Sequence, residues 1–177
     1  LPISLLADAG YPDGIELEVR TGQIETERRV VNAITQTAAA AGINFVVNAT
    51  EKSVYDQDRG QCEMQMGTIF WGLDYPDPEN IAGVIVAGTS GSRNACGYGE
   101  HEAVEEVEAL YDEAVAAPLG EERIETFREL QDLAVGELAL IIPIYHGVST
   151  NLINPALGGQ PIDNQGNRIF KNIDLGS

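Results

Sequence analysis

The sequence predicts an α/β fold in which a mixed, mostly parallel sheet is flanked by helices. Near the amino terminus a strand pattern, a helix pattern and a second strand pattern follow one another with short joints, an order that implies a right-handed crossover and parallel pairing. Further on, the stretch 60–80 begins as a strand and ends in a loop rich in proline, aspartate and aromatic residues. Loops at the carboxyl ends of strands are where α/β proteins usually bind ligands.

The composition is that of a globular and strongly acidic protein. The chain has 177 residues, 44% of them apolar, and a formal net charge of −18. This apolar content suffices for one core, whereas the negative charge disfavours nucleic acid and anionic membrane surfaces as partners. No apolar run is long enough to span a membrane and no signal peptide opens the sequence, so composition leaves the location open.

The first third of the chain alternates helix and strand patterns. Gly10 is expected to end the first helix, because glycine readily adopts the left-handed conformation of a helix terminus. Apolar and charged residues alternate in the strand that follows, which predicts one buried and one solvated face, as at the margin of a sheet. Ser53 is the expected cap of the third helix. The predicted elements are a helix over 1–9, a strand over 15–20, a helix over 26–41, a strand over 43–47 and a helix over 53–59.

The third predicted strand leads into the loop. Apolar and polar residues alternate from Cys62 to Met66, and the unbroken apolar run 69–71 predicts that the strand ends buried. Pro76 and Pro78 then prevent further pairing, because proline has no backbone N–H to donate. The strand is therefore expected to stop at a rigid loop.

That loop carries the only tryptophan of the chain, Trp71, together with Asp74, Tyr75 and Asp77. From the residues alone, both aspartates could simply form turns and Trp71 could belong to the core. Asp77 is also expected to cap the helix that begins near Glu79.

The second half is predicted to be mainly helical, with β-prone segments at its end. The joint 118–120 is too short for anything but a helix pair that folds back on itself. The inward side chains of that pair are predicted to be Val104, Val107, Leu110, Ala114, Ile124, Phe127, Leu130 and Ala134. The predicted elements are a helix over 79–87, a polar segment over 88–99, helices over 100–117 and 120–137, strands over 138–145 and 148–153, a break over 155–159 and a hairpin turn over 163–167.

Catalytic motifs are scarce. The sequence has no Gly-x-Ser-x-Gly elbow, no phosphate-binding glycine loop and no His-Glu-x-x-His. His101 and Glu105 have metal-ligand spacing on a helix, but a solvated helix face explains them better. His146 follows a predicted buried strand and is interpreted as a structural histidine. Neither a metal nor a cofactor is expected.

Several segments, in the same order, resemble the carboxyl-terminal portion of family 5 extracellular solute-binding proteins, the oligopeptide, dipeptide and nickel class that serves ABC importers. These segments are LLADAGYPDG at 5–14, AGI at 41–43, WGLDYPDPEN at 71–80, NACGY at 94–98, the helix 123–133, IPIY at 142–145 and NP at 154–155. Together they extend over nearly the whole chain.

The resemblance implies that residues 1–153 form one α/β lobe of a two-lobed periplasmic-binding-protein clamshell. Residues 154–177 would form a tail, expected to be a short hairpin, that returns to the other lobe. The implied function is the binding of a small solute, a peptide before others, in the cleft between the lobes and its delivery to the permease. A binding protein for nickel or another non-peptide solute is the alternative. A metal-assisted hydrolase using Asp74, Asp77 and a histidine is a more distant one.

The resemblance also implies roles for single residues. Asp74 would pair with the α-ammonium group of a peptide, because a cation buried in a closing cleft needs a charged partner. Trp71 would wall the site, and Tyr75, Asn94 and Tyr98 would line it. The protein is expected to be a periplasmic or extracellular monomer, with a lipid anchor as one option.

Overall fold

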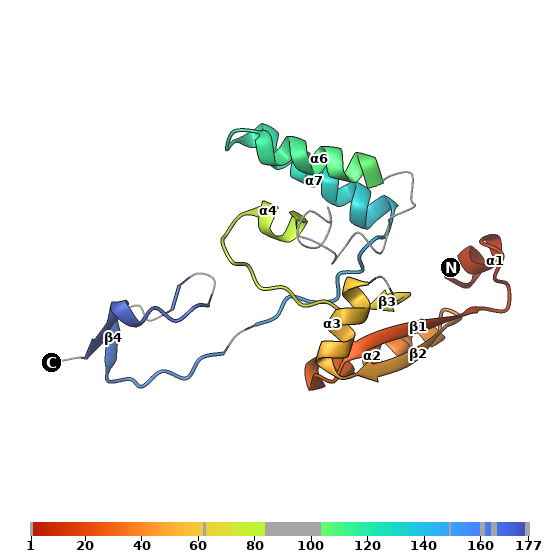
Figure 1. Ribbon diagram of the computed structural model, residues 1–177, viewed down its shortest axis with the longest axis horizontal. Coiled ribbons are helices and arrows are strands. Elements are labelled where there is room, and N and C mark those ends of the chain that lie inside the picture. Colours follow the sequence, from red (N-terminus) through yellow and green to blue (C-terminus); the bar gives the residue numbers. More distant parts are fainter. Residues whose placement is uncertain are drawn as a thin grey trace.

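The computed structural model describes residues 2–61, 63–83, 104–148, 150–159, 162–163 and 166–175. Figure 1 shows a small sheet with its helices, a helical hairpin, and a C-terminal β-hairpin that lies apart from both. The helices are α1 (Pro2–Asp8), α2 (Glu25–Ala39), α3 (Lys52–Gly60), α4 (Pro78–Ile81), α6 (Val104–Ala116) and α7 (Glu121–Gln131), which continues as a π-helix over Asp132–Glu137. The strands are β1 (Ile15–Gly22), β2 (Ile43–Thr50), β3 (Met66–Gly67), β4 (Leu157–Gly159) and β5 (Ile173–Leu175), and a 3-10 turn, Phe170–Asn172, precedes β5.

The first sheet is parallel, and its strand order is β2-β1-β3. The predicted crossover from β1 through α2 to β2 is confirmed, with Ile15 opposite Ile43 and Gly22 opposite Thr50. The predicted place of β1 at the margin of the sheet is wrong, since β1 is the central strand. Its charged side chains are paired within the protein instead: Arg20 donates to Asp58 of α3 at 2.6 Å. A polar face can thus belong to a central strand when a neighbouring helix supplies the countercharge.

Helices pack on the sheet through a few buried side chains. α2 packs on β2 and β1 through Val31, and α3 packs on β1 through Tyr55, whose hydroxyl donates to the backbone carbonyl of Thr68. The cap of α3 is Glu51 rather than the predicted Ser53, because the Glu51 carboxylate accepts from the Ser53 backbone N–H at 3.0 Å. A carboxylate is favoured there by the helix dipole.

The third strand is much shorter than predicted. Among the described residues, only Met66 and Gly67 pair with β1, because the side chain of Gln65 accepts from the Glu18 backbone N–H at 2.9 Å and so replaces a ladder hydrogen bond. Cys62 lies outside the described residues. The apolar run 69–71 is not the predicted buried strand end, since Phe70 is 67% exposed. The chain leaves the sheet at this point as an extended loop toward α4 (Figure 1).

The predicted helical hairpin is confirmed, with α6 packed on α7. Its core contains Ala82, Val107, Tyr111, Ala114, Phe127, Leu130 and Ala134. The prediction that Ile124 points inward is wrong: it is 44% exposed, whereas the neighbouring Arg123 is only 8% exposed. The buried face of α7 therefore includes Arg123, which faces α4, and not Ile124.

The carboxyl-terminal third departs most from the predictions. The strands predicted over 138–145 and 148–153 do not form in the described part of the chain, where residues 138–148 and 150–154 lie outside any ladder. A strand needs a neighbour with which to exchange hydrogen bonds, and apolar composition alone does not supply one. The residues on either side of the predicted turn over 163–167 pair as expected, through a bridge between Ile162 and Arg168. Residues 164–165 lie outside the described residues. β4, paired with β5, occupies part of the predicted break.

The helix predicted over 79–87 is helical as far as the structure describes it, since α4 extends to Ile81 and residues 82–83 continue it as a π-helix. Residues 84–103 lie outside the described part of the chain. The polar segment predicted over 88–99 and the start of the helix predicted from residue 100 fall there.

The core of the helical hairpin yields a first prediction. Leu130→Ala should lower the free energy of unfolding by about 2–5 kcal/mol, because it leaves a cavity at a fully packed position. Ile124→Ala is the matched control on the same helix and should cost less than about 1 kcal/mol. Urea denaturation of both variants measures the difference. Equal losses would contradict the assignment of Leu130 to the buried face of α7 and of Ile124 to its exposed face.

Candidate functional site

The candidate site is the loop that joins β3 to α4. It starts at Thr68, at the carboxyl end of the parallel sheet, and ends at Asp77 (Figure 1). Its start is anchored by one carboxylate oxygen, Glu27 Oε2, which accepts from Thr21 Oγ1 at 3.2 Å, from the Gly22 N–H at 3.1 Å and from Thr68 Oγ1 at 3.3 Å. The first turn of α2 thereby fixes the ends of β1 and β3 to each other.

The other end of the loop is fixed by Asp77, which is the N-cap of α4 as predicted. Its side chain accepts from the Glu79 backbone N–H at 2.9 Å, and Pro78 occupies the first helical turn. Proline suits this position because its missing N–H would have no helical partner there. The first turn of α4 is therefore fixed by the Asp77 cap and by Pro78.

Asp77 also forms a bidentate ion pair with Arg123 of α7. The guanidinium donates to both carboxylate oxygens, at 3.0 and 2.8 Å, and lies 4.8 Å from the centre of the Phe127 ring. These hydrogen bonds hold the pKa of Asp77 below its ordinary value. The same carboxylate raises the pKa of Arg123.

The sequence-based reasoning missed this pair. The signal that could have revealed it is helical spacing, because Arg123 lies four residues before Phe127 and therefore on its face. A charged residue on the buried face of a helix requires a partner of opposite charge. Asp77 is that partner.

Asn80, in α4, joins three groups of the loop. It is 5% exposed. Its side-chain carbonyl oxygen accepts from the Trp71 indole N–H at 2.8 Å and from the Asp74 backbone N–H at 3.2 Å. Its amide nitrogen donates to Asp74 Oδ2 at 3.4 Å. The role of Asn80 was also missed, and no signal in the sequence distinguishes it from other asparagines.

The structure brings some of the predicted site residues together, and the others lie outside the described residues. Trp71 and Asp74 share Asn80 as a partner, and Tyr75, 42% exposed, lies in the same loop. Partial desolvation raises the pKa of the Tyr75 phenol. Asn94 and Tyr98 lie outside the described residues.

The two aspartates of the loop have different electrostatic surroundings. Asp77 is paired with Arg123. Asp74 is exposed, and within the described part of the chain it forms no ion pair and accepts a side-chain hydrogen bond from Asn80. The loop thus presents one neutralised carboxylate and one that has no countercharge among the described residues.

A metal-assisted hydrolase would need the carboxylate of Asp77, which is paired with Arg123. The described residues contain no group of three or more His, Cys, Asp and Glu that could hold a metal ion. Asp77 is occupied by Arg123, and His146 lies exposed in an extended segment. His101 lies outside the described residues.

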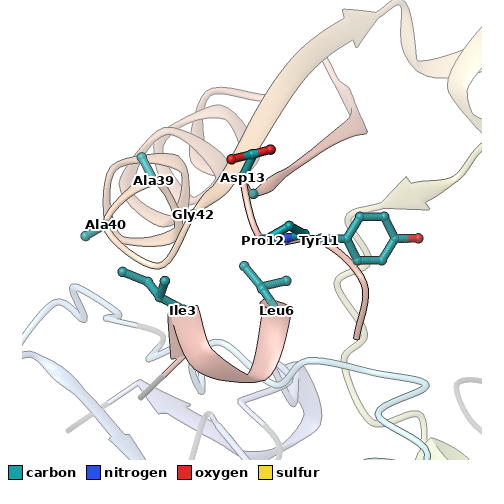
Figure 2. A pocket seen from close by; sticks show the side chains of 9 residues that line it. Ile3, Leu6, Tyr11, Pro12, Asp13, Ala39, Ala40 and Gly42 are labelled. Atoms are coloured by element: carbon teal, nitrogen blue, oxygen red, sulfur yellow. The ribbon is translucent and has the colours of Figure 1, made fainter. Parts of the chain in front are cut away.

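A pocket of about 200 Å³ lies elsewhere, between α1 and the amino ends of β1 and β2 (Figure 2). Its lining is mainly apolar, with Ile3 and Leu6 of α1 facing Ala39, Ala40 and Gly42. Backbones approach closely here, because a Cβ atom at Gly14 would lie 2.4 Å from the carbonyl oxygen of Gly42. Such a contact admits only glycine at position 14. The pocket is a gap where α1 packs on the neighbouring elements, and it lacks the converging polar groups of a ligand site.

Comparison with known proteins identifies the fold of this arrangement. No family model matches the chain. Heme-binding protein A of Haemophilus influenzae is 26% identical over 161 residues, which are 88% of this chain and 28% of that protein. The structure of HbpA2 from Haemophilus parasuis matches with a TM-score of 0.80 and 21% identity, over 99% of this chain and 35% of that one. The murein tripeptide binding protein MppA of Escherichia coli matches with a TM-score of 0.78 and 20% identity, over 97% of this chain and 33% of that one.

These matches confirm the expected fold, which is that of one part of a periplasmic solute-binding protein. The chain spans about a third of the length of the proteins that it matches. Those proteins are named as binding proteins and not as enzymes. No helix in the described ranges is long and apolar enough to cross a membrane.

The ion pair of Asp77 yields a second prediction. Asp77→Asn keeps an oxygen to cap α4 but removes the charge that faces Arg123, so it should lower the free energy of unfolding at pH 7 by about 1–3 kcal/mol. A carboxylate whose folded-state pKa is lowered stabilises the protein above its unfolded pKa of about 3.9, and this contribution disappears as the pH falls through the folded-state value. The stabilities of wild type and variant should therefore converge below about pH 4.

Urea denaturation at a series of pH values measures this convergence. Glu125→Gln, which removes an exposed partner of Arg128 on the same helix, is the matched control and should cost less than about 0.5 kcal/mol. A difference between wild type and Asp77→Asn that stays constant from neutral to acid pH would show that the charge of Asp77 does not stabilise the fold.

Proposed function

We propose that this chain is the carboxyl-terminal part of a solute-binding protein of an ABC importer, and that Asp74 pairs with the ammonium group of a peptide. The observation that carries the proposal is the contrast between the two aspartates of the loop. Asp77 is neutralised by Arg123, whereas Asp74 is exposed and lacks a countercharge in the described part of the chain. An uncompensated carboxylate in a fixed loop is suited to receive a cation from a ligand.

The physical chemistry of binding favours this role for Asp74. A charged ligand group that leaves water for a closing cleft loses its hydration, and a charge-assisted hydrogen bond compensates for that loss. A carboxylate that already had a partner would have to exchange it, so only the unpaired one gains a new ion pair on binding. The net charge of −18 also favours cationic or zwitterionic solutes over anionic ones.

The remaining predicted site residues fit the same proposal. The Trp71 indole is held by Asn80 beside Asp74, so its ring can wall the site, and Tyr75 can contribute a phenol to its edge. Asn94 and Tyr98 belong to the proposed site on the strength of the resemblance. Catalysis is not part of this function, and neither a metal nor a cofactor is required.

The site requires a second lobe. Large apolar side chains of the segment 142–153 are exposed, with Ile142 at 61% and Leu152 at 100%. Residues 1–153 would form one lobe, and the tail 154–177, whose β-hairpin lies apart from the other elements in Figure 1, would belong to the other. The complete protein would act as a periplasmic or extracellular monomer, lipid-anchored or free, that delivers its solute to the permease.

A non-peptide solute is the second candidate. The relative from Haemophilus influenzae is named a heme-binding protein, and a binding protein for heme, nickel or another non-peptide solute could share this lobe. Heme propionates are anionic, and Asp74 would repel them. This electrostatic argument ranks the peptide first.

The role of Asp74 yields a third prediction, tested in the full-length protein. Asp74→Asn should leave stability nearly unchanged and should weaken peptide binding by about 2–5 kcal/mol, as losing one partner of a buried charge pair does. Asp77→Asn should lower stability and should weaken binding much less than Asp74→Asn does, since its charge is used within the fold. Isothermal titration with a tripeptide, together with denaturation of both variants, measures the two effects.

The matched ligand is the N-acetylated tripeptide, which lacks the ammonium group. Wild-type protein should bind it as weakly as Asp74→Asn binds the free tripeptide. Equal binding of both peptides by wild type would refute the ammonium role of Asp74. Tight binding of hemin without any peptide binding would establish the second candidate instead.

The isolated chain of 177 residues yields a fourth prediction. It should fold, because the sheet and the α6–α7 hairpin have their own cores, but it should bind poorly, because a single wall of a cleft excludes little water. A saturating tripeptide should raise the melting temperature of the full-length protein and leave that of the isolated chain almost unchanged. A shift of several degrees in the isolated chain would mean that the site lies wholly within it.

A further inference from the structure

We infer that Asn80 is the positioning residue of the site, which orients Asp74 toward the ligand and fixes Trp71 beside it. The inference rests on the proposed function, because it gives Asn80 a role through Asp74. It also makes a statement about the unliganded protein that can be tested without any ligand.

The hydrogen-bond geometry shows which end of the Asn80 side-chain amide is the oxygen and which is the nitrogen. Two N–H groups, those of the Trp71 indole and the Asp74 backbone, converge on Oδ1 at 2.8 and 3.2 Å. The oxygen must therefore point into the loop, which leaves Nδ2 to donate to Asp74 Oδ2 at 3.4 Å. One buried amide thus determines the place of the indole, of the Asp74 backbone and of one Asp74 carboxylate oxygen.

Asparagine is well suited to this position among short side chains. The site needs an acceptor for two N–H groups and a donor for a carboxylate, and an amide supplies both from one planar group. Aspartate would keep the acceptor but would place a second carboxylate against Asp74, and two carboxylates at such a distance raise the pKa of one of them. Alanine would leave the indole N–H without this partner.

Asn80 itself is held in place from α7. Its backbone N–H donates to the carbonyl oxygen of Asp77 at 3.1 Å, in the helix that Asp77 caps and that Arg123 fixes by its ion pair. A continuous set of hydrogen bonds therefore leads from the core of the α6–α7 hairpin to the exposed carboxylate of Asp74. The carboxylate is oriented before a ligand arrives, so binding does not have to order it.

The experiment uses the full-length protein and the variants Asn80→Ala and Asn80→Asp. The first readout is ligand-free: the ¹H–¹⁵N resonance of the Trp71 indole, identified by its loss in Trp71→Phe. Asn80→Ala should shift this resonance and speed its exchange with solvent, because the acceptor is gone. Asn80→Asp should leave it nearly unchanged, because the acceptor remains.

The second readout is the ratio of the dissociation constants of the N-acetylated and the free tripeptide. A misplaced Asp74 loses its preference for the ammonium group, so Asn80→Ala should reduce this ratio by about tenfold. Asn80→Asp keeps the acceptor that fixes the loop and should therefore retain more of this preference than Asn80→Ala does. A residue that only stabilises the fold would weaken both peptides alike.

Asn44→Ala is the matched control, because it removes an asparagine hydrogen bond to Glu16 on the sheet, at 3.0 Å, away from the loop. It should change neither readout. An unmoved indole resonance in Asn80→Ala would overturn the assigned geometry, and a moved resonance with an unchanged ratio would overturn the positioning role. If wild type itself binds both peptides equally, the proposed function fails and the role of Asn80 toward a ligand fails with it, while the indole resonance still decides whether Asn80 holds the loop.

Discussion

The ion pair between Asp77 and Arg123 is the interaction on which the candidate site depends. It joins residues 46 positions apart and links the loop to the core of the α6–α7 hairpin. The carboxylate serves the guanidinium and the first turn of α4 at once, so its loss would release the helix start and leave Arg123, 8% exposed, without its main partner. Breaking such a pair costs more than the pair itself contributes, because the remaining charge stays desolvated.

The two aspartates of the loop show how surroundings decide the use of identical side chains. Three positions separate Asp74 from Asp77, yet one faces α7 and the other faces solvent. Had Arg123 paired with Asp74 instead, Asp77 would be the carboxylate without this guanidinium, and Asp77 is already used as the cap of α4. Arg123, the arginine on the buried face of α7, pairs with Asp77, and in the described part of the chain Asp74 forms no ion pair.

Local patterns in the sequence sufficed to predict the elements that depend on residues close together in the chain. The crossover from β1 to β2, the cap at Asp77 and the fold-back of α6 on α7 each follow from spacing or from a single turn. The patterns failed where residues distant in the sequence determine the structure. Gln65 shortens β3 because its side chain, rather than its backbone, bonds to β1. Arg123 occupies the buried face of α7 through its ion pair, whereas the hydrophobic pattern had placed Ile124 there. The segment 138–153 is apolar and β-prone, but pairing depends on a neighbour that composition cannot specify.

In the proposed function, the loop would gain its suitability for binding from being fixed at both ends and exposed between them. At its start Thr68 is tied to Glu27, and at its end Asp77 is tied to Arg123. A freely moving loop would lose conformational entropy on binding, whereas a loop fixed in this way has lost most of it during folding. Exposure of Asp74 between the two anchors costs little, because a carboxylate is well hydrated. A ligand that displaces this water must offer the carboxylate a positive charge, because otherwise the lost hydration is not compensated.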